Sequence, residues 1–185
     1  VIPNITAPVA PSTLKMQVWR TNHGIVQTRT TVKGEPVAIV IERSTYGREA
    51  ASILGFSRFN NPDFVKNATT FKQAANGIDY TFNWFYADNK DIAYFSSGRL
   101  PVRATGTDTD MPRWSGKQYD PKGWLSAAEH PQEINPPTGY FASWNNKPAR
   151  GFAAADDKWS DNSIHRSLAL SNRAESAIAK GKISR

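Results

Sequence analysis

The chain has 185 residues, and its 23 Lys and Arg residues against 16 Asp and Glu residues give a formal net charge of +7. That length suffices for one ordinary hydrophobic core but not for two. Cysteine is absent, which excludes disulfide frameworks, thiolate nucleophiles, zinc fingers and iron–sulfur clusters. The longest apolar runs, such as Val37–Ile41, are only as long as a strand, so we expect no transmembrane span.

The first third of the chain has the pattern of an antiparallel strand set. Residues 1–13 form a Pro-rich leader, and Leu14–Thr21 alternates between apolar and polar residues, as a half-buried strand does. Lys33-Gly34 supplies a turn before the apolar run Val37–Ile41. We therefore expect strands over 14–41, in a sheet that buries at least one face.

Helices and an aromatic hairpin are predicted next. Two short helices fit residues 49–76, the second opened by Asn61 as N-cap and Pro62 at the first helical position. Residues 79–96 are typical of a hairpin with aromatic strands. Within it, Tyr80, Phe82, Trp84 and Tyr86 should share one face, and Phe85 should lie on the other.

The remainder is predicted to be mostly loop. Residues 97–138 are rich in Gly, Pro, Asp and Thr and indicate a long, ordered loop. Residues 139–145 resemble a strand, and apolar residues at helical spacing predict a C-terminal helix over 163–180. We expect 14–185 to form a single α+β segment.

Common catalytic and metal-binding patterns are missing from the sequence. His23, His130 and His165 are far apart and form no pair with metal-ligand spacing. There is no Gly-x-Ser-x-Gly motif that would favour a Ser-His-Asp triad. Asp156-Asp157, near Asp161, could bind a hard cation, but such acidic loops are more often solvated surface.

The most informative motif follows the expected strand 139–145. Trp144-Asn145-Asn146-Lys147-Pro148 places two amide side chains where the chain leaves the strand, and the proline prevents the strand from continuing. By itself, this pattern is more typical of a turn capped by its own side chains than of a functional site.

Several motifs occur in a fixed order along the chain: Val18–Gly24, Glu49–Phe56, Phe82–Asp88, Ser97–Arg99 with Pro101, Tyr119–Leu125, Asn135-Pro136 and Gly139–Pro148. In this order and at similar spacing, they resemble the β-chain of penicillin acylases and the related acyl-homoserine-lactone and cephalosporin acylases. The resemblance runs from about Val18 to about Arg173.

The resemblance implies an N-terminal-nucleophile hydrolase, with this chain as part of an αββα four-layer sandwich of mostly antiparallel strands and short helices. In that family a precursor cleaves itself, and the new N-terminal serine attacks an amide carbonyl while its α-amino group accepts the proton. An α-amino pKa of roughly 7.7–8.0 suits this role. The chain begins with Val1 and has no Ser-Asn-x-Trp start before Val18, so we expect the isolated segment to be inactive.

Four residues acquire roles in catalysis or acyl binding through the resemblance. Asn145 matches the asparagine whose side-chain amide completes the oxyanion hole, and Arg166 matches an arginine beside it. Phe56 and Phe82 match two residues that line the acyl pocket. Phenylalanine replaces a tryptophan and an isoleucine of penicillin G acylases at these two positions, which leaves the identity of the acyl group open.

The resemblance also implies the cofactors, partners and location of the full protein. Asp156 matches a calcium-binding aspartate, but Thr109 stands where the family has a proline ligand, so a structural calcium is expected only in a complete protein. The chemistry requires no cofactor. The expected partners are a small acyl-amide substrate and the remaining α- and β-chain segments of the same precursor, with no nucleic acid and no membrane. Family members are mostly periplasmic or extracellular.

Two other function classes stay open at this stage. A noncatalytic module could use Phe56, Phe82 and Trp144 to hold an acyl ligand. A basic nucleic-acid-binding domain would fit the net charge of +7, although its Lys and Arg residues are scattered along the chain rather than clustered.

Overall fold

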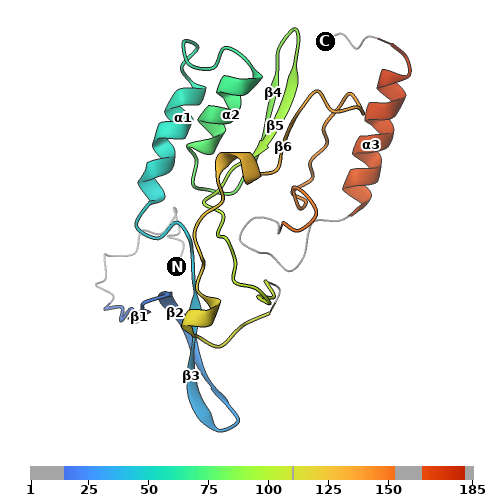
Figure 1. Ribbon diagram of the computed structural model, residues 1–185. Coiled ribbons are helices and arrows are strands. Elements are labelled where there is room, and N and C mark those ends of the chain that lie inside the picture. Colours follow the sequence, from blue (N-terminus) through green and yellow to red (C-terminus); the bar gives the residue numbers. More distant parts are fainter. Residues whose placement is uncertain (1–14, 110, 153–163, 182–185) are drawn as a thin grey trace, which may run out of the picture. The chain divides into compact units, whose positions relative to one another are not determined.

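The computed structural model describes residues 15–109, 111–152 and 164–181 (Figure 1). The chain divides into two compact units, Val1–Arg43 and Ser44–Arg185, where the sequence predicted a single segment over 14–185. No helix within the described ranges is long and apolar enough to cross a membrane.

The first unit is an antiparallel sheet in the order β1 (Arg20–Thr21), β2 (Gly24–Val32) and β3 (Glu35–Ile41). Lys33 and Gly34 have φ values of 52° and 86°, as a tight two-residue hairpin turn requires. The strand expected over 14–21 is reduced to β1. β2 has a register shift between Val26 and Thr28. Residues before Arg20 would have to pair with this irregular part of β2 in order to lengthen β1.

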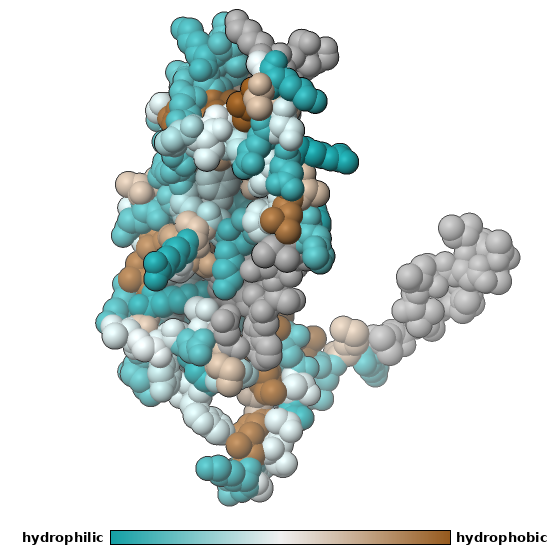
Figure 2. Space-filling view, turned by 90° about the vertical axis from the view of Figure 1, so that its right-hand side faces the viewer, coloured by the Kyte–Doolittle hydropathy of each residue, from teal (hydrophilic) through white to brown (hydrophobic). Residues whose placement is uncertain are grey.

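Apolar side chains of this first sheet remain exposed. The sequence predicted at least one buried face, yet Ile39 and Ile41 are 44% and 49% exposed. On the face of the molecule shown in Figure 2, hydrophobic surface likewise lies in separate patches among hydrophilic residues. The apolar run Val37–Ile41 therefore builds a hairpin but no core of its own within the described residues.

The second unit begins with helices inside the predicted range 49–76. They are the 3-10 helix η1 (Glu49–Ser52), α1 (Ile53–Phe59) and α2 (Ala68–Asn76). The predicted N-cap Asn61 is wrong, because α2 is capped by Asn67. Its side chain accepts a hydrogen bond from Thr70 N (3.0 Å), and the Thr70 hydroxyl accepts one from Asn67 N (3.1 Å). A helix starts where such reciprocal capping is available.

The second sheet has the antiparallel order β4-β5-β6. The predicted hairpin 79–96 contains β4 (Asn83–Ala87) and β5 (Ile92–Ser96). β6 (Gln132–Ile134) lies inside the loop expected over 97–138, which also contains the 3-10 helices η2 (Lys117–Tyr119) and η3 (Ala127–Glu129). Three residues are too few to show alternation, so only pairing with β5 reveals β6.

The hydrophobic core of the second unit lies between α2 and the β4-β5-β6 sheet. Its buried members are Ala68, Phe71, Ala75, Ala93 and Phe95, with Phe59, Val65, Trp84, Tyr86 and Ile134 packed against them. Gly55 lets α1 approach the end of α2, because a Cβ there would collide with the side chain of Ile78 and the backbone of Gly77. The last described helix, α3 (Ile164–Ile178), falls within the predicted range 163–180.

Candidate active site

The segment that carries the Trp-Asn-Asn motif forms no strand. Residues 139–145 were expected to be one, but they run as irregular chain. Side chains hold the segment to the β4–β5 hairpin instead: the Phe141 ring lies 6.0 Å from that of Phe85 and 5.8 Å from that of Tyr94. Asn83 Nδ2 donates to Ser143 Oγ at 3.4 Å. These side-chain contacts hold the segment in place without the backbone hydrogen bonds that define a strand.

The two asparagines of the motif have different roles. Asn146 Oδ1 accepts a hydrogen bond from Trp144 N (3.1 Å), so the turn expected from the sequence is present and Asn146 caps it. Asn145 has a φ of 69°, a left-handed conformation that asparagine tolerates better than most residues. Its side chain takes no part in that cap.

Asn145 and Arg166 are brought together although 21 residues separate them. Arg166 Nη1 lies 3.3 Å from Asn145 Oδ1 and 3.1 Å from the carbonyl oxygen of Trp144. The arginine therefore binds the acceptor atom of the amide, so the amide N–H groups are the donors left to meet a ligand. Both side chains are exposed, as a site that receives substrate requires.

Helix α3 carries Arg166 and also contacts the segment 139–145 through other residues. The Tyr140 hydroxyl lies 3.2 Å from Glu175 Oε1, on the same helix as Arg166. Gly139 lies close to the end of that helix, since a Cβ at Gly139 would meet Ile178 Cδ1 at 3.9 Å. The loop and α3 therefore contact each other beyond the Asn145–Arg166 pair.

Phe56 and Phe82 form an aromatic cluster around Trp84. The Trp84 ring lies 5.9 Å from Phe56 and 5.5 Å from Phe82, both edge to face, and 4.9 Å from Phe59. Phe56 is 37% exposed and Phe82 is 47% exposed, so both rings offer a face to a ligand. The cluster can hold an apolar group by burying its surface.

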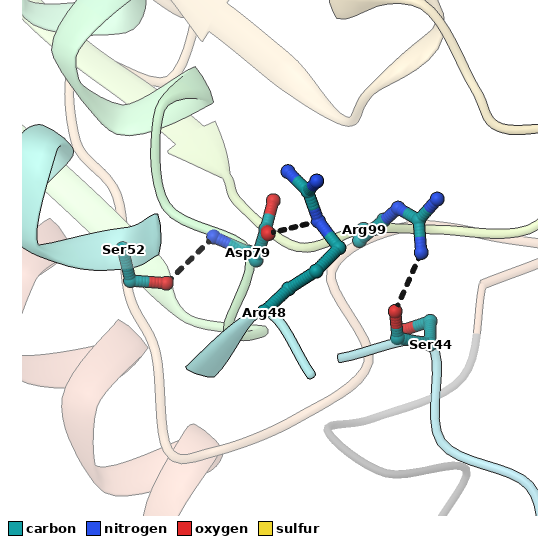
Figure 3. Close-up of polar contacts among 5 residues, drawn as sticks. All are labelled: Ser44, Arg48, Ser52, Asp79 and Arg99. Atoms are coloured by element: carbon teal, nitrogen blue, oxygen red, sulfur yellow. Dashed lines mark hydrogen bonds and ion pairs between the residues drawn. The ribbon is translucent and has the colours of Figure 1, made fainter. Parts of the chain in front are cut away.

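A polar network fixes the stretch that precedes α1 (Figure 3). Ser52 Oγ accepts a hydrogen bond from Asp79 N at 2.9 Å, and Arg48 Nε contacts Asp79 Oδ2 at 2.9 Å. Arg99 Nη1 donates to the carbonyl oxygen of Ser44 at 2.8 Å. Because Asp79 and Arg99 flank the β4–β5 hairpin, the network holds α1, and with it Phe56, against the strand next to Phe82.

Strand β4 connects the two parts of the site. Trp84 contacts α1, while the preceding residue, Asn83, contacts Ser143, two residues before Asn145. Tyr94 OH donates to Asn83 Oδ1 at 2.6 Å. Burial raises the pKa of the Tyr94 phenol to about 12, so the phenol remains a hydrogen-bond donor even in mildly alkaline solution.

Local sequence patterns did not indicate Asn83, Trp84 and Tyr94 as residues that support the candidate site. The alternation of β4 was the available signal, because it predicted that residues 82, 84 and 86 share a face. Their contacts agree with this: Phe82 meets Trp84, Tyr86 stacks on Phe71 in α2, and Phe85 lies on the opposite face. The partners of Asn83 lie 11 and 60 residues away, beyond the reach of any local pattern.

The calcium prediction concerns Asp156, which lies outside the described residues. Thr109, which stands where the family has a proline ligand, is half-buried. Among the residues that the structure describes, no group of three or more His, Cys, Asp or Glu side chains could hold a metal ion.

Comparisons with known proteins agree with the resemblance. The chain is 37% identical over 141 residues to a penicillin G acylase of Escherichia coli, covering 75% of this chain and 16% of that protein. It is 26% identical over 138 residues to the acyl-homoserine lactone acylase QuiP of Pseudomonas syringae pv. syringae, covering 74% of this chain and 16% of that protein.

The structural comparison gives the same result. A thermostable penicillin G acylase from Alcaligenes faecalis matches with a TM-score of 0.73 and 28% identity, covering 89% of this chain and 29% of that one. The predicted fold class, α+β with antiparallel sheets and short helices, is confirmed. The family model for penicillin amidase matches residues 4–184, and the chain belongs to the penicillin amidase family.

Proposed function

We propose that this chain is part of a hydrolase that cleaves the amide bond of small acyl amides, such as penicillin-like or N-acyl-homoserine-lactone-like compounds. The chain spans 16% of the length of the curated relatives it matches. The proposal therefore concerns the complete protein, in which other segments of the same precursor supply the serine nucleophile and its α-amino base.

The observation that carries the proposal is the contact between Arg166 and Asn145. When a nucleophile attacks an amide carbonyl, the oxygen becomes negatively charged, and a preorganised N–H donor stabilises it. Arg166 binds the oxygen of the Asn145 amide at 3.3 Å, and so directs the N–H groups toward a substrate. Its positive charge also polarises that amide and strengthens it as a donor.

The acyl group is proposed to bind against Phe56 and Phe82. Their partly exposed rings favour an apolar acyl chain or ring over a charged one. Neither residue titrates, so this part of the site contributes binding and orientation, while the Asn145–Arg166 pair contributes stabilisation of charge. The proposed reaction requires no cofactor, and no step of it uses Asp156 or a calcium ion.

The test is to express the complete reading frame that contains this chain and to assay a chromogenic phenylacetyl anilide and an acyl-homoserine lactone. Asn145→Ala should lower kcat by a factor on the order of 100 to 1,000, because one oxyanion donor is lost. Asn146→Ala is the matched control, since Asn146 caps the turn, and it should cost much less. Full activity of Asn145→Ala would contradict the proposed role.

The 185-residue chain expressed alone is expected to be inactive, because oxyanion stabilisation and acyl binding provide no nucleophile. Enzyme-like rates from this chain, lost on Asn145→Ala, would show that expectation to be wrong. A noncatalytic acyl-binding module is the second candidate, favoured by the exposure of Phe56 and Phe82. It predicts that the complete protein binds phenylacetate but hydrolyses neither amide.

A further inference from the structure

Ser97 is a fully buried serine at the end of β5, beside the aromatic cluster. Its backbone N–H donates to the carbonyl oxygen of Phe82 at 2.9 Å, which continues the pairing of β4 and β5 by one more residue. The backbone pairing alone would accept any small residue here. The hydroxyl is what distinguishes serine from alanine at this position.

The Ser97 hydroxyl makes a hydrogen bond with each of its available sites. Oγ donates to the carbonyl oxygen of Tyr80 at 2.6 Å, and accepts from Trp84 Nε1 at 2.9 Å and from Phe82 N at 3.3 Å. A hydroxyl has one proton to donate and two lone pairs to accept with. The three partners therefore use the full hydrogen-bonding capacity of the hydroxyl. They belong to residues 80, 82 and 84, which alternate along β4 and the segment that leads into it.

These bonds hold the wall of the aromatic cluster in one orientation. The indole of Trp84 is the ring that both Phe56 and Phe82 contact, at 5.9 and 5.5 Å. An indole can rotate about two side-chain bonds, and its single N–H determines which orientation satisfies it in a buried setting. Ser97 also binds the backbone of Phe82, so one atom positions two adjacent rings.

We infer that Ser97 is a positioning residue that sets the acyl selectivity of the site. The inference rests on the proposed function, since it assigns Phe56 and Phe82 to the acyl group. Ser97 does not touch the acyl group; it acts through Trp84 and Phe82. Loss of its hydroxyl leaves the Trp84 N–H and the Tyr80 carbonyl without this partner, and the indole is then free to turn toward another acceptor.

The experiment measures kcat and KM of the complete protein for phenylacetyl amides and for straight-chain acyl amides of increasing length. Ser97→Ala should change the ratio of kcat/KM between the two acyl classes by about tenfold, mainly through KM. Ser97→Thr keeps the hydroxyl and should restore the ratio to within about threefold. Ser96→Ala is the matched control, because Ser96 is equally buried but its hydroxyl makes none of these bonds.

A coupling measurement separates positioning from a general loss of folding. In a Trp84→Phe background there is no indole N–H to hold and only the bond to Phe82 N can act, so Ser97→Ala should change the selectivity ratio by a smaller factor. If Ser97→Ala instead lowers kcat/KM by the same factor for every acyl class, or changes the ratio equally in both backgrounds, the inference is overturned.

A binding measurement separates this inference from the proposed function. Calorimetry of Asn145→Ala protein with phenylacetate and with hexanoate reports acyl recognition without hydrolysis. If the complete wild-type protein hydrolyses no amide but Ser97→Ala still shifts the ratio of the two dissociation constants, the hydrolase proposal fails and the positioning role stands. If the complete protein hydrolyses the amides and Ser97→Ala changes neither the kcat/KM ratio nor the ratio of the two dissociation constants, the positioning role is wrong and the hydrolase proposal stands.

Discussion

The two faces of β4 are built from alternate residues of the same five-residue strand, yet they differ in kind. Trp84 and Tyr86 face the helices and pack on aromatic rings. Asn83 and Phe85 face the other way and hold the loop that carries Asn145, with Asn83 using directional hydrogen bonds. Period-two alternation thus lets one strand contact the aromatic cluster on one face and the Asn145 loop on the other.

This difference predicts a separation in kinetics within the proposed function. Apolar contacts on the helix face bind the acyl group similarly in the ground state and the transition state, so changes there should appear mainly in KM. Contacts on the opposite face position a donor for charge that exists only in the transition state, so changes there should appear in kcat.

Among the residues that hold the Asn145 amide and its loop, the greatest loss of activity is expected at Arg166. Arg166→Met removes the group that binds Asn145 Oδ1 and the Trp144 carbonyl, so the amide is no longer held. We expect kcat of the complete protein to fall by about 100-fold, the effect of misplacing a catalytic group by about 1 Å, with little change in KM. Arg173→Met, on the same helix and also exposed, is the control. A change confined to KM would contradict the predicted kinetic difference between the two faces of β4.

A smaller effect is expected at Asn83. Asn83→Ala removes the link between Tyr94 and Ser143, and should lower kcat by about tenfold, since a lost buried hydrogen bond misplaces the Asn145 loop. Phe82→Ala, one residue earlier, should instead raise KM for aromatic acyl groups. Asn89→Ala, in the exposed hairpin turn, should change neither. Equal kcat and KM effects at residues 82 and 83 would refute separate roles for the two faces.

The smallest effect concerns stability at high pH. Burial raises the pKa of Tyr94 from 10.0 to about 12, so the folded state retains a proton that the unfolded state loses. This contribution to stability is complete below pH 10 and is lost as the pH rises toward 12. In urea unfolding at several pH values, Tyr94→Phe should reduce the loss of stability between pH 10 and 12.

The matched comparison for that measurement is Tyr86→Phe on the helix face. A hydrogen bond to the Asp88 carboxylate raises the pKa of Tyr86 to about 12, so Tyr86→Phe should also reduce the loss of stability, and the double variant Tyr86→Phe/Tyr94→Phe should reduce it further. If the wild-type protein and Tyr94→Phe lose stability with the same slope between pH 10 and 12, burial of Tyr94 does not contribute as argued.

Much of the fold was predictable from local patterns. Alternation identified the β4–β5 hairpin, Lys33-Gly34 marked the β2–β3 turn, and helical spacing located α3. The secondary-structure predictions were wrong where tertiary contacts, rather than the local sequence pattern, determine the conformation of the segment. Residues 139–145 resemble a strand in sequence, but Phe141 and Ser143 anchor them through side chains instead. β6 is too short to leave a pattern and exists because β5 offers an edge.

An ordered set of motifs was sufficient to predict the family from the sequence, and the resemblance singled out Asn145, Arg166, Phe56 and Phe82. How these residues combine became visible only in the folded chain. It separated the turn-capping Asn146 from Asn145, brought Arg166 to the amide oxygen, and placed the Ser97 hydroxyl between Trp84 and Phe82. The physical reason is that a hydrogen bond depends on distances of about 3 Å between atoms, and residues far apart along the chain meet at that distance only after folding.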